Sequence, residues 1–403
     1  MDISFEDTKT SFAYKTDKEL KKARFLFSSM GKEWLVKAGL WLTPLTLKLG
    51  LPVKSMIRKT IFSQFVGGET LEETSPVAEK LKQFHVQVIF DYGVEGKEGE
   101  ENFDHARDEF IKVIQYAATQ TNIPFMSVKL TGLARFDLLQ KLDEESSYND
   151  VIQGKLALEK LDDNEKNEWK KVVSRLQRIC EAAKRCNIGV LIDAEESWIQ
   201  DSVDAVTTQM MQKFNVEKAV VYNTAQLYRS DRLQFVKDIS RFARENNFKP
   251  GIKLVRGAYM EKERKRAKEL NYASPINQTK QATDDEYNAG LKFCIDPANG
   301  IYVVIGSHNE YSNLHATELI KKFGLSLNYN HIHFSQLYGM SDNITFNLAK
   351  AGCSVSKYLP FGPIKDVIPY LMRRAQENSS VSGQTGRELG LIKNEIHRRK
   401  AEK

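Results

Sequence analysis

Residues 189–223 read GVLIDAEESWIQDSVDAVTTQMMQKFNVEKAVVYN, and this stretch contains the pattern that decides the fold. Two short β-rich runs, Gly189–Asp193 and Ala219–Asn223, flank the helical pattern of Val203–Phe214. A strand, a helix and a second strand in this order predict two parallel strands joined by a right-handed crossover.

The same alternation continues on both sides of this unit. The other β-rich runs are Val86–Asp91, Phe125–Leu130, Gly251–Val255, Tyr302–Ser307, His331–Gln336 and Ser354–Leu359. The other helical patterns are Trp169–Arg185, Ser230–Asn246, Asp284–Phe293, Tyr311–Phe323 and Ile344–Ala351. Eight such runs predict an α/β fold closed into a (β/α)₈ TIM-like barrel. An open doubly wound sheet is the alternative, and it is disfavoured because no GxGxxG follows any run.

The chain is expected to divide into three parts. Residues 1–80 are predicted to form helices that pack on the barrel, and residues 81–380 to form the barrel with a C-terminal helix. Residues 381–403 are predicted to be a basic tail that frays. Within the barrel, the polar residues 143–167 are expected to form an exposed insertion.

Composition excludes several classes of protein. Of the 403 residues, 41% are hydrophobic and 28% are charged, which is typical of a soluble globular protein. The net charge of +6 is spread along the chain, so no nucleic-acid partner is expected. The four cysteines form no CxxC pair and predict reduced thiols in a cytoplasmic protein. The N-terminus lacks the features of a secretory signal or a transit peptide.

One apolar segment, residues 34–51 (WLVKAGLWLTPLTLKLGL), raises the question of a membrane. Lys37, Pro44 and Lys48 interrupt it, so it falls short of the roughly 20 apolar residues that a spanning helix needs. One interpretation is a helix pair packed on the body of the protein. The other is an amphipathic surface with peripheral contact to the inner face of a membrane, anchored by Trp34, Trp41 and flanking basic residues.

Polar side chains lie at the end of every β-rich run. They are Asp91 and Tyr92; Lys129 and Thr131; Asp193, Glu195 and Glu196; Asn223, Thr224 and Gln226; Lys253, Arg256 and Tyr259; Ser307, His308 and Asn309; Gln336 and Tyr338; and Lys357 and Tyr358. Any one of them could be a satisfied structural group. Together they are hard to explain by packing, because burying unpaired polar groups is costly. In a (β/α)₈ barrel the active site lies at this C-terminal face.

No metal site is expected from these residues. His331 and His333 share one face of a run, but no third ligand has a recognisable spacing. No nucleophile motif indicates covalent hydrolysis. His308 is interpreted either as a general base or as a hydrogen-bonding partner of a ligand.

The final helical pattern, residues 369–378 (PYLMRRAQEN), carries two adjacent arginines. Tyr370 precedes Arg373 and Arg374 by three and four positions, so it can share a helix face with them. Two guanidinium groups make a strong carboxylate clamp, since each offers a planar fork of donors. Glu377 is placed to neutralise or orient one of them. A solvated charge pair is the alternative, but the apolar, loop-like segment from Pro360 to Leu371 indicates a packed helix.

Taken together, the motifs resemble those of the proline dehydrogenase family, in its single-function form. They are FVGGETLEE (65–73), FDYGVEG (90–96), VKLTGLARF (128–136), IDAEES (192–197), VYNTAQLY (221–228), KLVRGAYMEKER (253–264), GSHN (306–309), FSQLYGMSD (334–342), KYLPFGP (357–363) and IPYLMRRAQENSS (368–380). The resemblance implies FAD-dependent oxidation of L-proline to Δ1-pyrroline-5-carboxylate, the first step of proline catabolism. It also implies a quinone as electron acceptor.

The resemblance implies a role for particular residues. Those expected to bind proline are Lys129, Asp193, Tyr259, Tyr358, Tyr370, Arg373 and Arg374. Those expected near non-covalent FAD are Asn223, Gln226, Lys253, Val255, Arg256, Gly257, Ala258, Lys280, Ser307, His308 and Asn309, with Glu377 beside the arginines. Relatives often carry Arg at the position of Lys253, and some carry Lys at that of Arg256.

Three alternative functions are left open. The first is oxidation of hydroxyproline or another small cyclic amino acid. The bulky Tyr358 favours proline, because the resemblance implies a small residue at that position in a hydroxyproline-oxidising relative. The second is a barrel enzyme that acts on another small carboxylate with a different phosphate-bearing cofactor. The third is a non-catalytic binding barrel.

Overall fold

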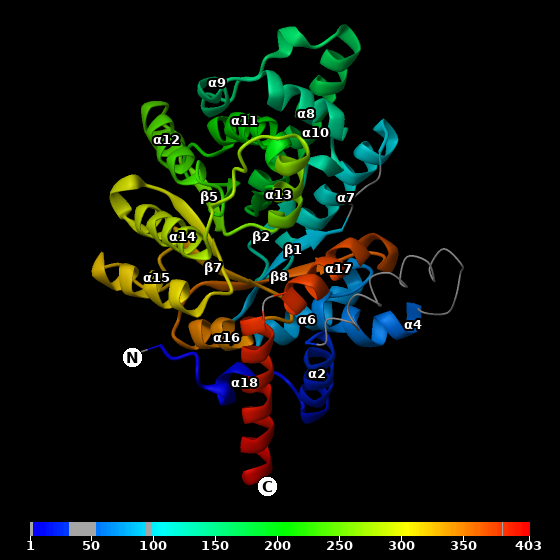
Figure 1. The fold of residues 1–403 in the computed structure, drawn as a ribbon, viewed down its shortest axis with the longest axis vertical. Coiled ribbons are helices and arrows are strands. Elements are labelled where there is room, and N and C mark those ends of the chain that lie inside the picture. The colour runs from blue at the N-terminus through cyan, green and yellow to red at the C-terminus, as the bar shows by residue number, and fades with distance from the viewer. Residues whose placement is uncertain (1–2, 32–53, 94–97, 381) are drawn as a thin grey trace. The chain divides into compact units, whose positions relative to one another are not determined.

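The eight strands form a closed barrel in the order β1 to β8 (Figure 1). The computed structural model describes residues 3–31, 54–93, 98–380 and 382–403, with the side chains of 376–385 left out. The strands are β1 Gln87–Tyr92, β2 Phe125–Val128, β3 Gly189–Ile192, β4 Val221–Gln226, β5 Gly251–Val255, β6 Tyr302–Gly306, β7 Ile332–Leu337 and β8 Val355–Phe361. Every predicted run therefore overlaps a strand. This confirms the (β/α)₈ barrel and excludes the open sheet.

Contacts along the chain define two compact units, which are residues 96–335 and residues 1–95 with 336–403. The first unit contains β2 to β6 and most of β7. Its helices are α7 Glu100–Ala118, α8 Phe136–Glu145, α9 Tyr148–Ile152, α10 Asp163–Cys186, α11 Ser197–Phe214, α12 Arg232–Glu245, α13 Met260–Glu269, α14 Lys280–Ile295 and α15 Glu310–Lys322. Helices α7, α10, α11, α12 and α14 pack directly against these strands.

The second unit contains β1 and β8, which pair in parallel. Its helices are α1 Thr8–Ser11, α2 Asp17–Met30, α4 Lys54–Ile57, the π-helix Arg58–Phe62, α5 Ser63–Phe65, α6 Leu71–Lys82, α16 Asp342–Lys350, α17 Ile364–Ser380 and α18 Ser382–Ala401. Apolar residues from both ends of this unit form one core. Phe27 of α2, Leu371 of α17 and Leu391 of α18 are all buried in it.

The segment 143–167 is exposed over much of its length as expected, but α9 packs on α11 and α12 and buries Val151 and Ile152. Two expectations about local structure were wrong. The C-terminal residues form α18 rather than a frayed tail, since Ile392 and Ile396 are buried in the core of their unit. The segment 360–371 is not loop-like, because α17 begins at Ile364 and continues through Pro369, whose missing N–H removes one bond from the helix.

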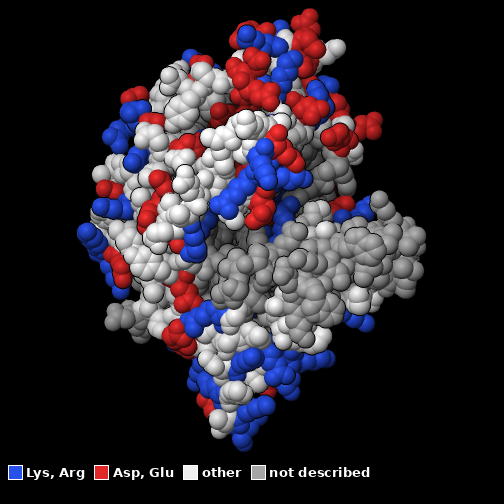
Figure 2. Space-filling view, in the orientation of Figure 1, with Lys and Arg blue, Asp and Glu red and all other residues white. Residues whose placement is uncertain are grey.

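Charged side chains of both signs are spread over the face of the molecule that Figure 2 shows. Basic residues gather over the end of α18, where the last turn carries Arg398, Arg399 and Lys400. Several of them are paired. Arg399 contacts both Glu395 and Asp17, and Arg398 contacts Glu395. This charge is therefore partly neutralised within the unit.

The apolar segment 34–51 lies outside the described residues. Within the part of the chain that the structure describes, no helix combines the length and the hydropathy that crossing a bilayer would require.

Candidate active site

Strands β3 and β5 place two opposite charges at the same level of the barrel. Lys253 is the register partner of Thr224 on β4, and Asp193 lies one position beyond the partner of Asn223. The Lys253 Nζ donates to Asp193 Oδ1 in an ion pair that is largely shielded from solvent. The structure thus joins a residue expected to contact proline with one expected to contact FAD.

A second carboxylate, Glu195, follows strand β3; in the sequence it was a polar residue at the end of a β-rich run, with no role assigned to it. It is buried and accepts hydrogen bonds from the Thr131 N–H at 3.3 Å and the Thr131 hydroxyl at 2.7 Å. Burial raises the pKa of Glu195 to about 7, although the Thr131 bonds and the charge of Lys129 oppose the shift. The signal in the sequence was the acidic doublet after a buried strand.

The peptide of Glu195 is fixed from two elements. Its N–H donates to Gln200 Oε1 of α11 at 3.1 Å, and its carbonyl accepts from Gln226 Nε2 of β4 at 2.7 Å. The resemblance placed Gln226 near FAD. In this structure its side-chain amide donates at least one hydrogen bond within the protein, to the Glu195 carbonyl.

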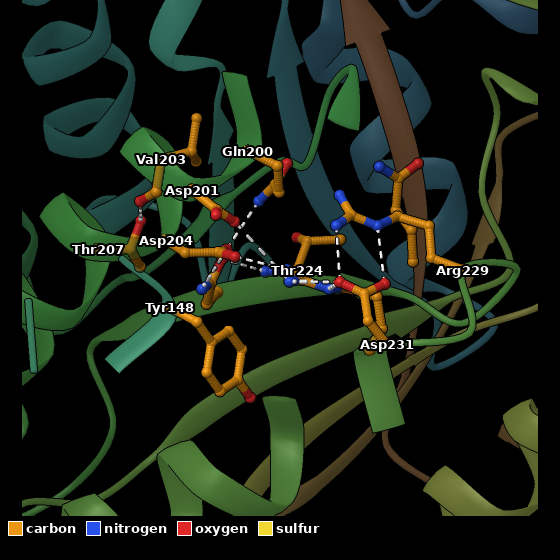
Figure 3. Close-up of polar contacts among 12 residues, drawn as sticks. Tyr148, Gln200, Asp201, Val203, Asp204, Thr207, Thr224, Arg229 and Asp231 are labelled. Atoms are coloured by element: carbon orange, nitrogen blue, oxygen red, sulfur yellow. Dashed lines mark hydrogen bonds and ion pairs between the residues drawn. The ribbon is translucent and has the colours of Figure 1, made fainter. Parts of the chain in front are cut away.

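Asn223 belongs to a buried network outside the sheet. Its Nδ2 donates to Asp204 Oδ1 at 2.9 Å, and its Oδ1 accepts from the Thr224 N–H. Asp204 also accepts from Gln200 and pairs with Arg232 at 2.5 Å. Figure 3 shows Asp204 of α11 beside Gln200, with Arg229 and Asp231 bonded to each other nearby. Asn223 supports the strand in this structure, and its contact with FAD stays a prediction.

Arg256, just past β5, is the centre of a second polar cluster. Its guanidinium donates to Asp284 Oδ1 at 2.8 Å, Ser307 Oγ at 3.0 Å and Ser312 Oγ at 2.9 Å. It also lies 4.3 Å from the ring centroid of Tyr287. These contacts join the end of β5 to α14 and to the start of α15.

Other predicted cofactor residues adjoin this cluster. Lys280 pairs with Asp284 while its side chain is mostly exposed. The Asn309 N–H donates to Ser307 Oγ at 3.1 Å, and the Asn309 side chain caps the N-terminus of α15. His308, between them, is half-buried. A helix N-terminus beside basic side chains suits a phosphate group.

The turn after β5 exposes backbone. Gly257 has a φ of +136°, and a Cβ there would lie 2.5 Å from the ring of Tyr228. Both facts require glycine at this position. Gly257 and Ala258 are exposed and Val255 is half-buried, while Tyr259 is the N-terminal cap residue of α13. The turn can therefore bring its peptide groups close to a ligand.

The predicted carboxylate clamp lies in the other unit, on α17. Arg374 is 6% exposed, and its guanidinium carbon lies 5.2 Å from the ring centroid of Tyr370. Arg373 is half-buried, and Tyr358 of β8 is 8% exposed. Val367 and Leu371 lie on the same face of α17 as Arg374 and are buried in the core, so Arg374 stands on the packed face of the helix. The Glu377 side chain lies outside the described residues.

His333 of β7 and His331, just before this strand, both pack against aromatic rings. His331 stacks on Tyr302 with ring centroids 3.7 Å apart, and His333 meets Phe125 edge-on. Burial lowers the pKa of His333 to about 3, so it is neutral at physiological pH. Among the described residues, no three His, Cys, Asp or Glu side chains cluster as metal ligands would.

Comparisons with known proteins agree with the motifs. A family model described as proline dehydrogenase matches residues 75–387. The chain is 33% identical over 386 residues to the mitochondrial proline dehydrogenase 1 of Dictyostelium discoideum, covering 87% of this chain and 67% of that protein. It is 32% identical over 365 residues to the hydroxyproline dehydrogenase of Xenopus laevis, covering 85% of this chain and 78% of that one.

A solved structure shows the same fold. Proline utilization A (PutA) from Bdellovibrio bacteriovorus, inactivated by N-propargylglycine, matches with a TM-score of 0.73 at 19% identity. The match covers 94% of this chain but 42% of the PutA chain, so this protein spans less than half the length of that structure.

Proposed function

This chain belongs to the proline dehydrogenase family and is an oxidoreductase acting on proline, and we propose that it converts L-proline to Δ1-pyrroline-5-carboxylate in an FAD-dependent reaction. The observation that carries the finer proposal is the packed helix α17, which holds Arg374 against Tyr370. A fixed pair of cations can orient a small cyclic substrate by its carboxylate. Such orientation accounts for a large part of the rate increase that an enzyme gives.

In this proposal Arg373 and Arg374 bind the substrate carboxylate. Bidentate guanidinium contacts fix both the position and the plane of a carboxylate. Tyr358 and Tyr370 pack around the ring and limit its size, and Lys129, Asp193 and Tyr259 are further residues that the resemblance assigns to proline. Asp193 is held in place by its ion pair with Lys253.

The residues around Arg256 fit FAD. A flavin dinucleotide needs donors for its pyrophosphate and close approach of backbone, and this region offers Arg256, Lys280, the N-terminus of α15 and the exposed turn at Gly257. We therefore assign cofactor binding to Val255–Ala258, Lys280 and Ser307–Asn309, with Lys253 nearby. FAD accepts a hydride when it is bound.

The alternative with an observation in its favour is oxidation of hydroxyproline, because a hydroxyproline dehydrogenase is among the relatives. Tyr358 supports proline instead. It is bulky and buried, and an added ring hydroxyl would need both space and a polar partner. The ratio of kcat/KM for the two substrates separates the alternatives.

We propose a quinone as the final electron acceptor, which would bring the protein to a membrane surface. Co-sedimentation with liposomes tests this contact. Loss of binding after deletion of residues 1–60 supports an N-terminal contact, and unchanged binding refutes it.

One experiment tests cofactor, substrate and reaction class together. The absorbance spectrum of the purified protein is recorded anaerobically before and after L-proline is added. A flavin spectrum that bleaches with L-proline supports the proposal. A colourless protein, or a flavin spectrum that proline does not change, overturns it.

A further inference from the structure

A single buried ammonium group organises the turn between β7 and α16, residues 338–341. Lys357 of β8 is fully buried, and its Nζ donates to the Met340 carbonyl at 2.5 Å and the Leu337 carbonyl at 3.5 Å. The same Nζ lies 3.0 Å from Asp342 Oδ1. Three acceptors, one in the turn and one on each side of it, therefore converge on one charge.

Asp342 is itself held from the N-terminal segment. Its Oδ2 accepts from the Tyr14 hydroxyl at 2.7 Å and lies 3.2 Å from Lys15 Nζ. Burial would raise the pKa of Asp342, but Lys15 and Lys357 lower it to about 2. The carboxylate is thus ionised at every pH at which the protein is expected to function.

The C-terminal helix supplies the other support of this turn. Glu388 of α18 is buried and accepts the Ser341 N–H. Ser341 has a φ of +51°, a conformation that costs energy for a residue other than glycine. The strained peptide persists because the surrounding bonds hold it. Gln64 Nε2 adds a bond to the Gly339 carbonyl at 2.8 Å.

The turn is connected directly to Tyr358. The Tyr338 N–H donates to the Tyr358 carbonyl at 2.9 Å, and Tyr358 follows Lys357 along β8. A displacement of the turn or of Lys357 would therefore move the backbone that carries the Tyr358 ring.

We propose that Lys357 and Glu388 are positioning residues for the substrate pocket. They fix the turn 338–341 and, through it, Tyr358, so that α18 sets which ring the pocket accepts. The inference rests on the proposed function, in which Tyr358 lines that pocket.

The hydrogen bond, rather than the charge of Glu388, is the part that matters. Asp342, Lys357 and Lys15 all face this carboxyl, and burial raises its pKa to about 7. A neutral carboxyl still accepts an N–H bond, so Glu388→Gln keeps the support of Ser341. Glu388→Ala removes it.

The experiment compares Glu388→Ala, Glu388→Gln and Glu395→Ala in the full-length protein. Glu395 is a matched control, because it is also buried on α18 but contacts Arg398 and Arg399 instead of the turn. We expect Glu388→Ala to raise KM for L-proline about tenfold, with kcat changed less than about threefold. In the same variant, the ratio of kcat/KM for proline to that for hydroxyproline should fall. Glu388→Gln should stay within about twofold of wild type, and Glu395→Ala should lower Tm alone.

Two outcomes overturn the inference. One is a wild-type KM in folded Glu388→Ala, and the other is an equal rise of KM in Glu395→Ala. If Glu388→Ala does not fold, Lys357→Met is tested instead. It removes the hydrogen bonds that Lys357 of β8 donates to the turn, and it must raise KM for L-proline by a similar factor. Its unchanged KM would also refute the inference. The proposed function fails separately, if wild-type protein does not oxidise L-proline.

Discussion

Lys253 and Asp193 form a buried ion pair across β4, at the level of Thr224. Neutralising one partner leaves the other charge buried and uncompensated. We expect Asp193→Asn to lower the free energy of unfolding by about 3 kcal/mol, whereas Asp193→Asn combined with Lys253→Met should lose less. Urea unfolding of both proteins measures this. Equal losses in the single and double variants would show that the pair is not coupled.

The clamp on α17 should affect binding of substrate and not of cofactor. Arg373→Met and Arg374→Met each remove a fork of donors, so KM for L-proline should rise at least about tenfold while bound flavin stays at the wild-type level. Steady-state kinetics and the flavin-to-protein absorbance ratio measure both. Lys365→Met is the control, because Lys365 is an exposed cation on the same helix. A normal KM in both arginine variants would contradict the clamp.

Tyr358 should decide between two substrates. Tyr358→Ser removes the phenol ring, which opens space beside the substrate ring while keeping a hydroxyl, so relative use of hydroxyproline should rise by about tenfold or more. The ratio of kcat/KM for hydroxyproline and proline measures the change. Tyr358→Phe keeps the ring and should retain the preference for proline. An unchanged ratio in the serine variant would assign selectivity elsewhere.

The cluster around Arg256 should affect cofactor retention. Arg256→Met removes the donors to Asp284, Ser307 and Ser312 together, so we expect a weaker flavin complex, with Kd raised about tenfold. Fluorescence of released flavin during dilution measures it. Lys237→Met on α12 is a surface control. Full retention of flavin by Arg256→Met would place the pyrophosphate elsewhere.

Glu195 should make stability depend on pH in a defined direction. Its pKa is raised from 4.5 to about 7, so the folded protein binds this proton more tightly than the unfolded chain does. The resulting stabilisation is complete below about pH 4.5 and is lost as the pH rises through about 7. Relative to Glu195→Gln, the wild type should therefore lose stability over this window and not above it. A constant difference across the window would refute the shifted pKa.

The alternation of strands and helices was predictable because the barrel strands are buried on both sides and read as short apolar runs. Gly251–Val255 was located to the residue. By contrast, the sequence did not predict that α18 packs in the core, since its many basic residues obscure the positions of Leu391 and Ile396. Packing between segments far apart in the chain leaves little local signal.

The candidate site, like the fold, has one part that could be predicted from the sequence and one part that could not. Residue types at strand ends could be predicted, because the topology places them at one face of the barrel. Their partners could not. Nothing near Asn223 in the sequence indicates that Asp204 binds its amide, and Glu195 carries a signal only as part of an acidic doublet. Which polar groups satisfy one another is decided by distances that only the folded chain defines.

The packing of α2 against α18 has a consequence for the order of folding. Arg399 donates to Asp17 over a separation of 382 positions, and the shared core also contains Leu371 of the clamp helix. During synthesis, α2 therefore leaves the ribosome long before its partner exists. The arginine-bearing helix gains its full support only when the C-terminal residues have emerged, so nascent chains interrupted before α18 should expose apolar surface to chaperones and proteases.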